Sequence, residues 1–409
     1  MSNKANPVNP SERFVILDVL RGIALLGICL ANYPEFSLYT FQDKEVVAAM
    51  PTVGIDKIWR YFHYIFIDGK FYSLFSLLFG IGFSIIIANI EKKNLNIYSV
   101  FYRRMFILAI IGFMHLLFLW AGDIVLLYAL IGFLLPFCRN FSNKKLLVIS
   151  LILIFLPVLM DAFKVLTDYR YSLAVPVEKA IQHFNLKTGI NDENFGVWLL
   201  NATNYSDIVR FNTPGSFIRC MEFIEGNRVV KVLGLFLLGL YIGRNRLYAK
   251  LGDYISILKK IRLYGFLWGL PTSCFFAWNE VNGHPLRAVG SSVVYAICIL
   301  PMTFAYISTI CLLFIKNPEM KIFKIFAAPG RMALTNYVGQ SVIGIIIFYG
   351  VGFKLALIGL IYVEMIAAGV FIFQVLFSNL WLRYFKFGPL EWIWRTLTYG
   401  RVIEIKTKS

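Results

Sequence analysis

The stretch LDVLRGIALLGICLANY, residues 17–33, decides the fold of this chain. It is apolar over nearly the length that crosses a bilayer, yet it carries Asp18, Arg21 and Asn32. A helix needs about 20 apolar residues to cross roughly 30 Å of hydrocarbon. An ionisable side chain within such a helix is costly, so it usually faces other helices or a hydrated cavity rather than lipid. The stretch therefore predicts a membrane helix with one polar face.

The whole chain has the composition of a polytopic membrane protein. Of its 409 residues, 58% are hydrophobic and 15% are charged, and the mean hydropathy is +0.69. The predicted fold is an all-α bundle of about ten transmembrane helices, with the spans near 14–32, 71–90, 103–120, 123–138, 146–165, 229–243, 263–280, 288–314, 332–350 and 355–377. Two further segments, 55–67 and 382–401, are predicted to be amphipathic helices at the membrane surface.

The net charge of +17 follows the positive-inside rule. With the N-terminus inside, 25 of the 40 Lys and Arg residues fall in cytoplasmic segments, and the short outer loops hold 6. This bias predicts that both termini are cytoplasmic, and it explains the charge without a nucleic-acid partner. It divides the chain into an N-terminal transmembrane half (1–165), an extracytoplasmic loop (166–228) and a C-terminal half (229–409). The six scattered cysteines show no metal-ligand spacing, so no metal is expected.

The polar groups of the first helix fall on one stripe. Asp18 and Arg21 are three residues apart and can pair. Eleven residues separate Arg21 from Asn32, which returns to within about 20° of the same face. Gly22 and Gly27 allow another helix to approach closely. One interpretation is the wall of a passage across the membrane. The other is an interfacial charge pair, with Asn32 capping the end of the helix.

A second cluster lies in GFMHLLFLWAGDIVLLYALIGF, residues 112–133. His115 lies near the outer end of its span, and Asp123 follows a very tight turn and begins the next helix. A lone histidine in an apolar helix is more often a structural donor than a catalyst. Its predicted depth, similar to that of Asn32, favours a base that takes a proton from an acceptor hydroxyl. His63, in the segment 55–67, is either a second base or an interfacial residue.

A third cluster lies in PGRMALTNYVGQS, residues 329–341. Pro329 and Gly330 are predicted to break the chain, and Arg331 to open the following helix. A helix N-terminus beside an arginine is a ready anion site, and Asn336 belongs to a polar stripe that continues into the membrane. The alternative is a positive-inside anchor followed by polar groups that pack helices together.

Five motifs in order resemble the YeiB-type bacterial membrane proteins, called domain of unknown function 418. They are LDVLRGIALLGICLAN, GKFYSLFSLLFGIGF, GFMHLLFLWAGDIVLLYALIG, GRMALTNYVGQS and WLRYFKFGPLEWIWRTLTYGR. The resemblance covers most of the chain and implies a multi-pass protein of the bacterial cytoplasmic membrane. That family has little settled function, and some members have been labelled possible transporters.

The first helix also resembles that of heparan-α-glucosaminide N-acetyltransferase and of the membrane acyltransferase-3 proteins. The second family shows a basic residue, ten others and then a histidine. Arg21 matches the basic residue, and Asn32 stands where that family has histidine and the heparan enzyme has asparagine. This resemblance implies an enzyme that takes an acyl group, such as acetyl, from acyl-CoA at the cytoplasmic face. The acceptor would be a glycan, a sugar or another small molecule on the outer side.

The resulting hypothesis is a membrane-embedded acyltransferase, working in the lipid bilayer as a homodimer, with acyl-CoA as co-substrate. Its expected catalytic residues are His115, Asn32, Asp123 and His63, and its expected acyl-CoA ligands are Arg21, Arg331 and Asn336. In this hypothesis Arg21, Asn32 and His115 line one passage. Asn32 polarises the acyl carbonyl or orients an imidazole, and His115 is oriented by Asp123 or a neighbour. Two alternatives stay open, a small-molecule transporter or exporter and a non-catalytic membrane scaffold.

Overall fold

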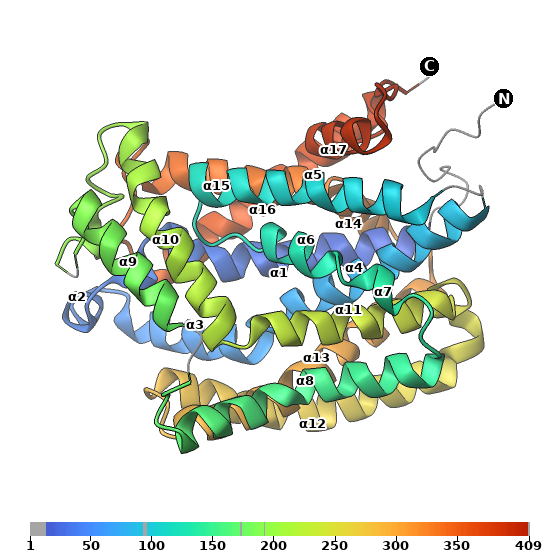
Figure 1. The fold of residues 1–409 in the computed structure, drawn as a ribbon, viewed down its shortest axis with the longest axis horizontal. Helices are drawn as coiled ribbons and strands as arrows, with labels where there is room; N and C mark the ends of the chain where they lie inside the picture. Colours follow the sequence, from blue (N-terminus) through green and yellow to red (C-terminus); the bar gives the residue numbers. More distant parts are fainter. Residues whose placement is uncertain (1–13, 93–95, 172–173, 192, 408–409) are drawn as a thin grey trace.

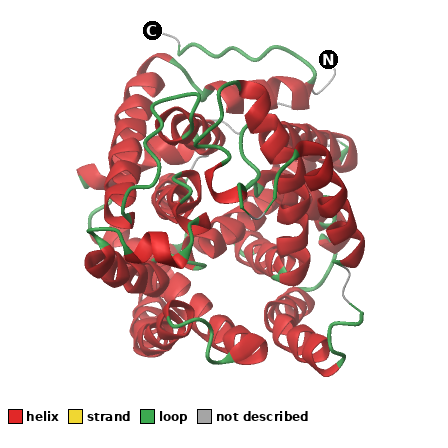
Figure 2. Cartoon of the chain, turned by 90° about the vertical axis from the view of Figure 1, so that its left-hand side faces the viewer, coloured by secondary structure: helices red, strands yellow, loops and turns green. Residues whose placement is uncertain are grey.

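The structure, a computed structural model, describes residues 14–92, 96–171, 174–191 and 193–407. These residues form helices and connecting loops, and the extended pairing among them is an isolated antiparallel bridge between Phe385 and Lys406. Figure 2 shows many of the helices end-on, with no strand. The predicted all-α polytopic bundle is confirmed.

The described helices in the first half of the chain are α1 (Val15–Phe36), α2 (Lys44–Ala48), α3 (Val53–Phe66), α4 (Lys70–Lys92), α5 (Ile97–Phe118), α6 (Val125–Gly132), α7 (Leu135–Cys138) and α8 (Asn143–Leu166). Four of these helices, α1, α4, α5 and α8, are longer than 20 residues. The amphipathic helix predicted over 55–67 is α3, and it leads into α4.

The second half begins with the region predicted as an outer loop, which is itself largely helical. The helices are α9 (Val175–Thr188), α10 (Tyr205–Glu225), α11 (Arg228–Arg244), α12 (Ile255–Val281), α13 (Arg287–Lys316), α14 (Lys321–Arg331), α15 (Ala333–Phe348), α16 (Leu360–Tyr384) and α17 (Pro389–Tyr399).

Each of the ten predicted spans contains helix, but not every one is long. By length and apolar composition, the described residues contain six ranges able to cross a membrane: Val15–Phe36, Val53–Lys92, Tyr98–Phe118, Asn143–Leu166, Arg287–Lys316 and Leu360–Tyr384. The pair α14–α15, bent by 78°, makes a seventh if it is one span. The span predicted at 123–138 consists of the short helices α6 and α7. The count of ten therefore stays a prediction.

The long helices lie side by side along one axis of the molecule (Figure 1). Helices α2, α9 and α10 gather at one end, and α17 lies at the other. If α17 is cytoplasmic, as the positive-inside rule predicts, α9 and α10 cover the outer side. The terminal residues 1–13 and 408–409 lie outside the described residues, so the predicted position of both termini stays a prediction.

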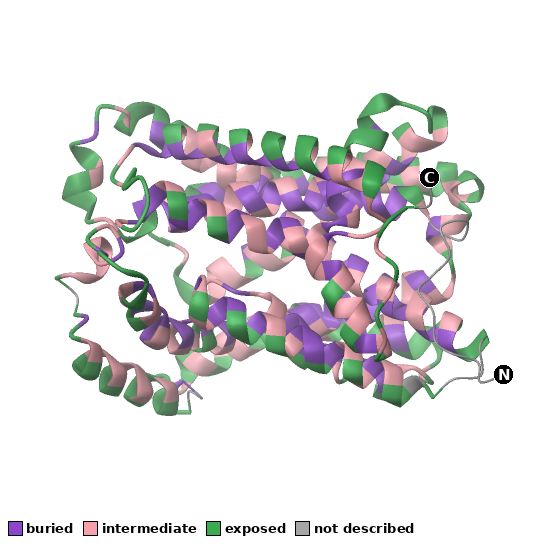
Figure 3. Cartoon of the chain, turned by 90° about the horizontal axis from the view of Figure 1, so that it is seen from above, coloured by how far each residue is buried: buried purple, intermediate pink, exposed green. Residues whose placement is uncertain are grey.

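Helix α1 lies among α4, α14, α15 and α16. Its contact with α14 depends on glycine, because a Cβ at Gly330 would lie 1.9 Å from the carbonyl oxygen of Asp18. Gly22 meets the backbone of α14 in the same way, as its sequence position predicted. Buried residues concentrate where helices face one another, and exposed residues follow the outer surfaces (Figure 3). Exposed apolar residues such as Leu159 and Trp268 suit a surface that faces lipid.

Two local predictions were wrong. Helix α1 continues to Phe36, so Asn32 is not its cap; Pro34 sits in the last turn, where it removes a single hydrogen bond and its fixed φ suits a helix. Arg331 does not open a helix but is the last residue of α14, because Pro329 and Gly330 are accommodated in that helix. The chain bends at Met332, and α15 starts afterwards.

Candidate functional site

A cavity of about 610 Å³ runs beside α1. Its lining includes α1 residues from Leu17 to Glu35, a stretch that covers roughly 30 Å of helix, about the thickness of a hydrocarbon core. Residues from α4, α5, α6, α10, α11, α13, α14, α15 and α17, and from the turns between helices, complete the lining. Asp18, Arg21 and Asn32 all line this cavity, so the three residues share one face of α1 as predicted.

Four arginines from four helices line the α17 end of the cavity. They are Arg21 on α1, Arg104 on α5, Arg331 on α14 and Arg395 on α17. The carboxylate of Asp18 accepts a hydrogen bond of 2.8 Å from Arg21, the pair expected from their spacing. The Arg104 guanidinium lies 3.6 Å from the ring centroid of Trp394, which holds it in place by a cation–π contact. This end carries more cations than anions.

Glu391, on α17, also lines this end, but its charge is directed at a helix terminus. Its Oε1 accepts hydrogen bonds from the backbone N–H groups of Leu334 and Thr335, at 2.6 and 3.1 Å, and its Oε2 accepts one of 2.6 Å from the Thr335 hydroxyl. Burial raises the pKa of the Glu391 carboxyl, and these hydrogen bonds act in the opposite direction. The helix N-terminus predicted to bind a ligand anion is thus occupied by this carboxylate.

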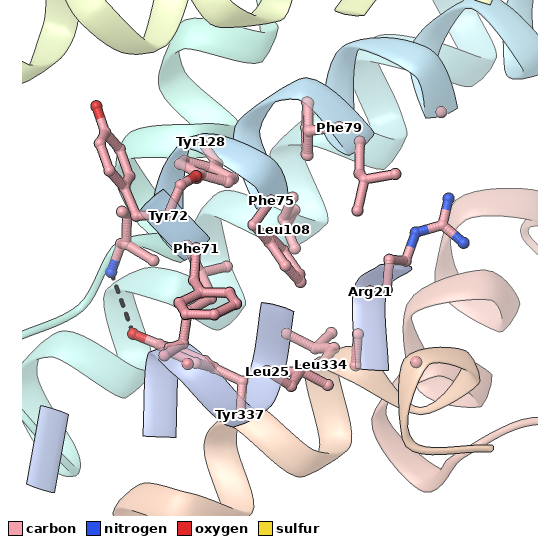
Figure 4. Close-up of a pocket in the computed structure, with 18 of the residues that line it drawn as sticks. Arg21, Leu25, Phe71, Tyr72, Phe75, Phe79, Leu108, Tyr128, Leu334 and Tyr337 are labelled. Atoms are coloured by element: carbon pink, nitrogen blue, oxygen red, sulfur yellow. Dashed lines mark hydrogen bonds between the residues drawn. The ribbon is translucent and has the colours of Figure 1, made fainter. Parts of the chain in front are cut away.

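The middle of the cavity is apolar and aromatic. Figure 4 shows the rings of Phe71, Phe75 and Tyr128 together, with Arg21 to one side of them. Such a wall suits an extended apolar chain and excludes water from whatever it surrounds. The cavity therefore joins a cationic end to an apolar interior.

The opposite end of the cavity is polar with mixed charge. Its lining carries two carboxylates, an amide and three cations, namely Glu35, Asp68, Asn32, Arg219, Arg228 and Lys231. Arg219 is anchored by a hydrogen bond from its Nη2 to the carbonyl oxygen of Gly122, and Lys231 lies 4.5 Å from the ring centroid of Tyr295. Both contacts fix cations at the wall.

His115 lies outside the cavity lining, and the expectation of one shared passage fails there. Its Nδ1 lies 2.9 Å from Asp123 Oδ2, as predicted, and its Nε2 lies 2.8 Å from the hydroxyl of Ser341. The side chain of Tyr337, whose ring centroid is 5.2 Å from that of His115, stands in the wall of the cavity. The imidazole therefore packs against a residue of the cavity wall without lining the cavity itself.

Three other predicted site residues, Asp123, His63 and Asn336, also lie outside the cavity lining. His63 is on α3, with its Nδ1 3.5 Å from Oε1 of Glu364 on α16. Asn336 donates to the carbonyl oxygen of Pro329 and to the hydroxyl of Ser378, at 3.2 and 2.9 Å. These contacts join α15 to α14 and α16, the helix-packing alternative that the sequence left open.

Comparison with known proteins places these features in a family. A family model described as "Protein of unknown function (DUF418)" matches residues 242–401. The uncharacterised protein YxaH of Bacillus subtilis is 30% identical over 422 residues, which cover 96% of each chain. The chain belongs to the DUF418 family. The uncharacterised protein YeiB of Escherichia coli is a further relative of this DUF418 protein, 28% identical over 95% of this chain and 96% of its own.

Sequence reasoning missed several residues of the site in this DUF418 protein. Arg104, Arg395 and Arg228 come from segments far from α1 in sequence, and no local pattern connects them to it. Glu35 and Ser341 had detectable signals. Glu35 is three residues after Asn32 on the same helical stripe, and Ser341 ends the quoted motif 329–341.

Proposed function

We propose that this protein binds acyl-CoA in the cavity beside α1 and transfers its acyl group to an acceptor on the outer side of the bacterial cytoplasmic membrane. The observation that carries the proposal is the cluster of Arg21, Arg104, Arg331 and Arg395 at one end of a cavity whose middle is apolar. Guanidinium groups bind phosphates through paired, charge-assisted hydrogen bonds. An apolar interior beyond them accommodates the acyl chain of the same molecule.

The roles of the lining residues follow from their order along the cavity. The arginine end would hold the phosphates of CoA, and the acyl group would extend past the aromatic rings toward Asn32. There the Asn32 amide can donate a hydrogen bond to the thioester carbonyl, where negative charge develops during attack. The polar end, with Glu35, Asp68 and Arg228, would bind the acceptor.

Acyl transfer also needs a group that removes the acceptor's proton. His115 keeps the role predicted from the sequence, because Asp123 fixes its orientation at 2.9 Å. Since His115 does not line the cavity and packs against the wall residue Tyr337, that role requires Tyr337 to move. The relatives named above are described only as uncharacterised, so they neither add to nor subtract from this proposal.

Binding and turnover test the proposal separately. The purified protein, reconstituted in nanodiscs, would be titrated with radiolabelled acetyl-CoA. It would then be incubated with glucose, glucosamine or glucuronic acid as acceptor probes. Free CoA should be measured by chromatography, because Cys220 and Cys274 are exposed and would react with thiol reagents. We expect saturable binding, with acceptor-dependent CoA release that Asn32→Ala and His115→Ala abolish.

Two results would contradict the proposal. One is the absence of both acetyl-CoA binding and CoA release. The other is protein-dependent flux of a small metabolite across liposomes in the absence of CoA, which would identify a transporter. The length of this cavity favours a protein that binds a ligand over a purely structural scaffold.

A further inference from the structure

Ser341, His115 and Asp123 form a hydrogen-bonded series across three segments of the chain. Ser341 is on α15, His115 is near the end of α5, and Asp123 lies in the turn before α6. The Ser341 hydroxyl lies 2.8 Å from His115 Nε2, and His115 Nδ1 lies 2.9 Å from Asp123 Oδ2. All three side chains are buried, with at most 2% of each residue exposed.

The direction of these hydrogen bonds follows from their chemistry. An ionised carboxylate only accepts, so Nδ1 of His115 donates to Asp123, and Nε2 is left to accept from the Ser341 hydroxyl. The other oxygen of Asp123 accepts from the backbone N–H of Leu126 at 2.7 Å, which fixes the carboxylate. A serine hydroxyl, an imidazole base and a carboxylate in this order form the arrangement that activates serine as a nucleophile.

The series lies one layer behind the cavity wall. Asp123 is between Gly122 and Ile124, which both line the cavity, and Ser341 is one helical turn after Tyr337, which also lines it. The Tyr337 hydroxyl accepts a hydrogen bond of 3.3 Å from the backbone N–H of Ile124 (Figure 4). This contact helps to hold the tyrosine in the wall, beside His115.

We propose that Ser341 is the nucleophile that receives the acyl group, that His115 is its base, and that Tyr337 is a movable part of the wall that admits the thioester. This inference rests on the proposed function, because it names how the acyl group leaves CoA. In the first step the buried His115 then takes its proton from Ser341, with which it is already in contact, and not from the acceptor.

The proposed reaction has two balanced steps. In the first, the Ser341 oxygen attacks the thioester carbonyl while its proton passes to His115 Nε2; the carbon–sulfur bond breaks, and CoA leaves as a thiol with that proton. In the second, a hydroxyl or amine of the acceptor attacks the seryl ester and gives its proton to His115. The Ser341 oxygen leaves, recovers the proton, and the acceptor is acylated.

The test is labelling of the intact protein at one serine. A small fluorophosphonate, which reacts with activated serines without any CoA, and radiolabelled acetyl-CoA without acceptor would each be incubated with the reconstituted protein. Peptide mass spectrometry would locate the adducts. We expect both on Ser341, none in Ser341→Ala, and labelling slower by about a hundredfold or more in His115→Gln. Tyr337→Phe, which removes the contact to Ile124, should label faster than wild type.

Controls separate a failed inference from a failed function. Ser150→Ala removes another buried serine, one bonded to the carbonyl of Leu147 on its own helix, and should label like wild type. A protein that binds acetyl-CoA and releases CoA, but whose Ser341→Ala variant turns over normally and whose Ser341 carries no adduct, overturns this inference alone. The series would then be a purely structural link between helices. Loss of acetyl-CoA binding in the wild type would instead overturn the proposed function.

Discussion

The two ends of the cavity differ in how their charges are balanced. At the α17 end four arginines line the wall, and the two carboxylates among them are engaged, Asp18 with Arg21 and Glu391 with the start of α15. At the other end Arg219, Arg228 and Lys231 share the wall with Glu35 and Asp68. A surplus of guanidinium groups suits a polyanion, whereas mixed charges suit a polar acceptor with several kinds of donor and acceptor groups.

This difference indicates that the two ends bind different molecules. If it is correct, substitutions at one end should change the binding of one substrate and leave the other unaffected. In the same assignment the apolar middle of the cavity accommodates the acyl group, because this group must reach from the CoA end to the acceptor end.

The largest effect is expected from removing two arginines at the α17 end. Arg331→Gln with Arg395→Gln should weaken acetyl-CoA binding by about a hundredfold or more, because each lost charge-assisted hydrogen bond costs about 1.5–3 kcal/mol. Titration with radiolabelled acetyl-CoA measures this. Arg383→Gln, at an exposed arginine on α16 outside the lining, is the control and should bind like wild type. If Arg383→Gln weakened acetyl-CoA binding as much as the double variant, binding would depend on the positive charge of the surface in general and not on the cavity.

A smaller and opposite pattern is expected at the mixed-charge end. Arg228→Gln should raise the KM for glucuronic acid by about tenfold, because one charge-assisted contact to its carboxylate is lost. The KM for glucose and the affinity for acetyl-CoA should stay near their wild-type values. Steady-state CoA release with each sugar measures this. If acetyl-CoA binding falls instead, the assignment of the two ends is wrong.

A still smaller effect is expected at Glu391. In Glu391→Gln the side-chain oxygen can still accept from Leu334 and Thr335, but the negative charge is gone. Acetyl-CoA should therefore bind up to about threefold more tightly, since a partly screened charge near phosphate is worth less than 1 kcal/mol. Burial raises the pKa of this carboxyl, so it protonates at a higher pH than an exposed glutamate. Lowering the pH should tighten binding in wild type more than in the variant.

Almost no effect is expected at His63. Because it contacts Glu364 on α16 and does not line the cavity, His63→Ala should leave acetyl-CoA affinity and turnover unchanged within about twofold. The same binding and CoA-release assays measure this. A large loss of turnover would show that His63 acts as a second base, as one interpretation of the sequence held. The reaction would then involve residues beyond the lining of this cavity.

The sequence predicted what depends on local spacing. The pairing of Asp18 with Arg21, the common face of Arg21 and Asn32, and the proximity of His115 to Asp123 all follow from positions a few turns apart, and the structure has each of them. The all-α membrane fold followed from hydropathy, because a bilayer imposes both length and apolar composition on helices that cross it.

Features that depend on tertiary arrangement could not be predicted in this way. Arg104 and Arg395 reach the cavity because α5 and α17 contact each other, and nothing in either segment specifies that contact. His115 was expected in the passage, but depth along a helix does not determine the direction in which its side chain points. The direction of the His115 side chain depends on its tertiary contacts, which include the ring of Tyr337.

Photoaffinity labelling with an acyl-CoA whose acyl chain carries a diazirine tests the central claim, occupation of the cavity by acyl-CoA, most directly. We predict crosslinks on peptides that contain Phe71, Phe75 and Tyr128, competed by excess acetyl-CoA and greatly reduced in the Arg331→Gln, Arg395→Gln variant. Crosslinks confined to exposed apolar residues such as Leu267 and Trp268 on α12, unaffected by excess acetyl-CoA, would contradict it, because they would show that the probe had entered only the surrounding lipid.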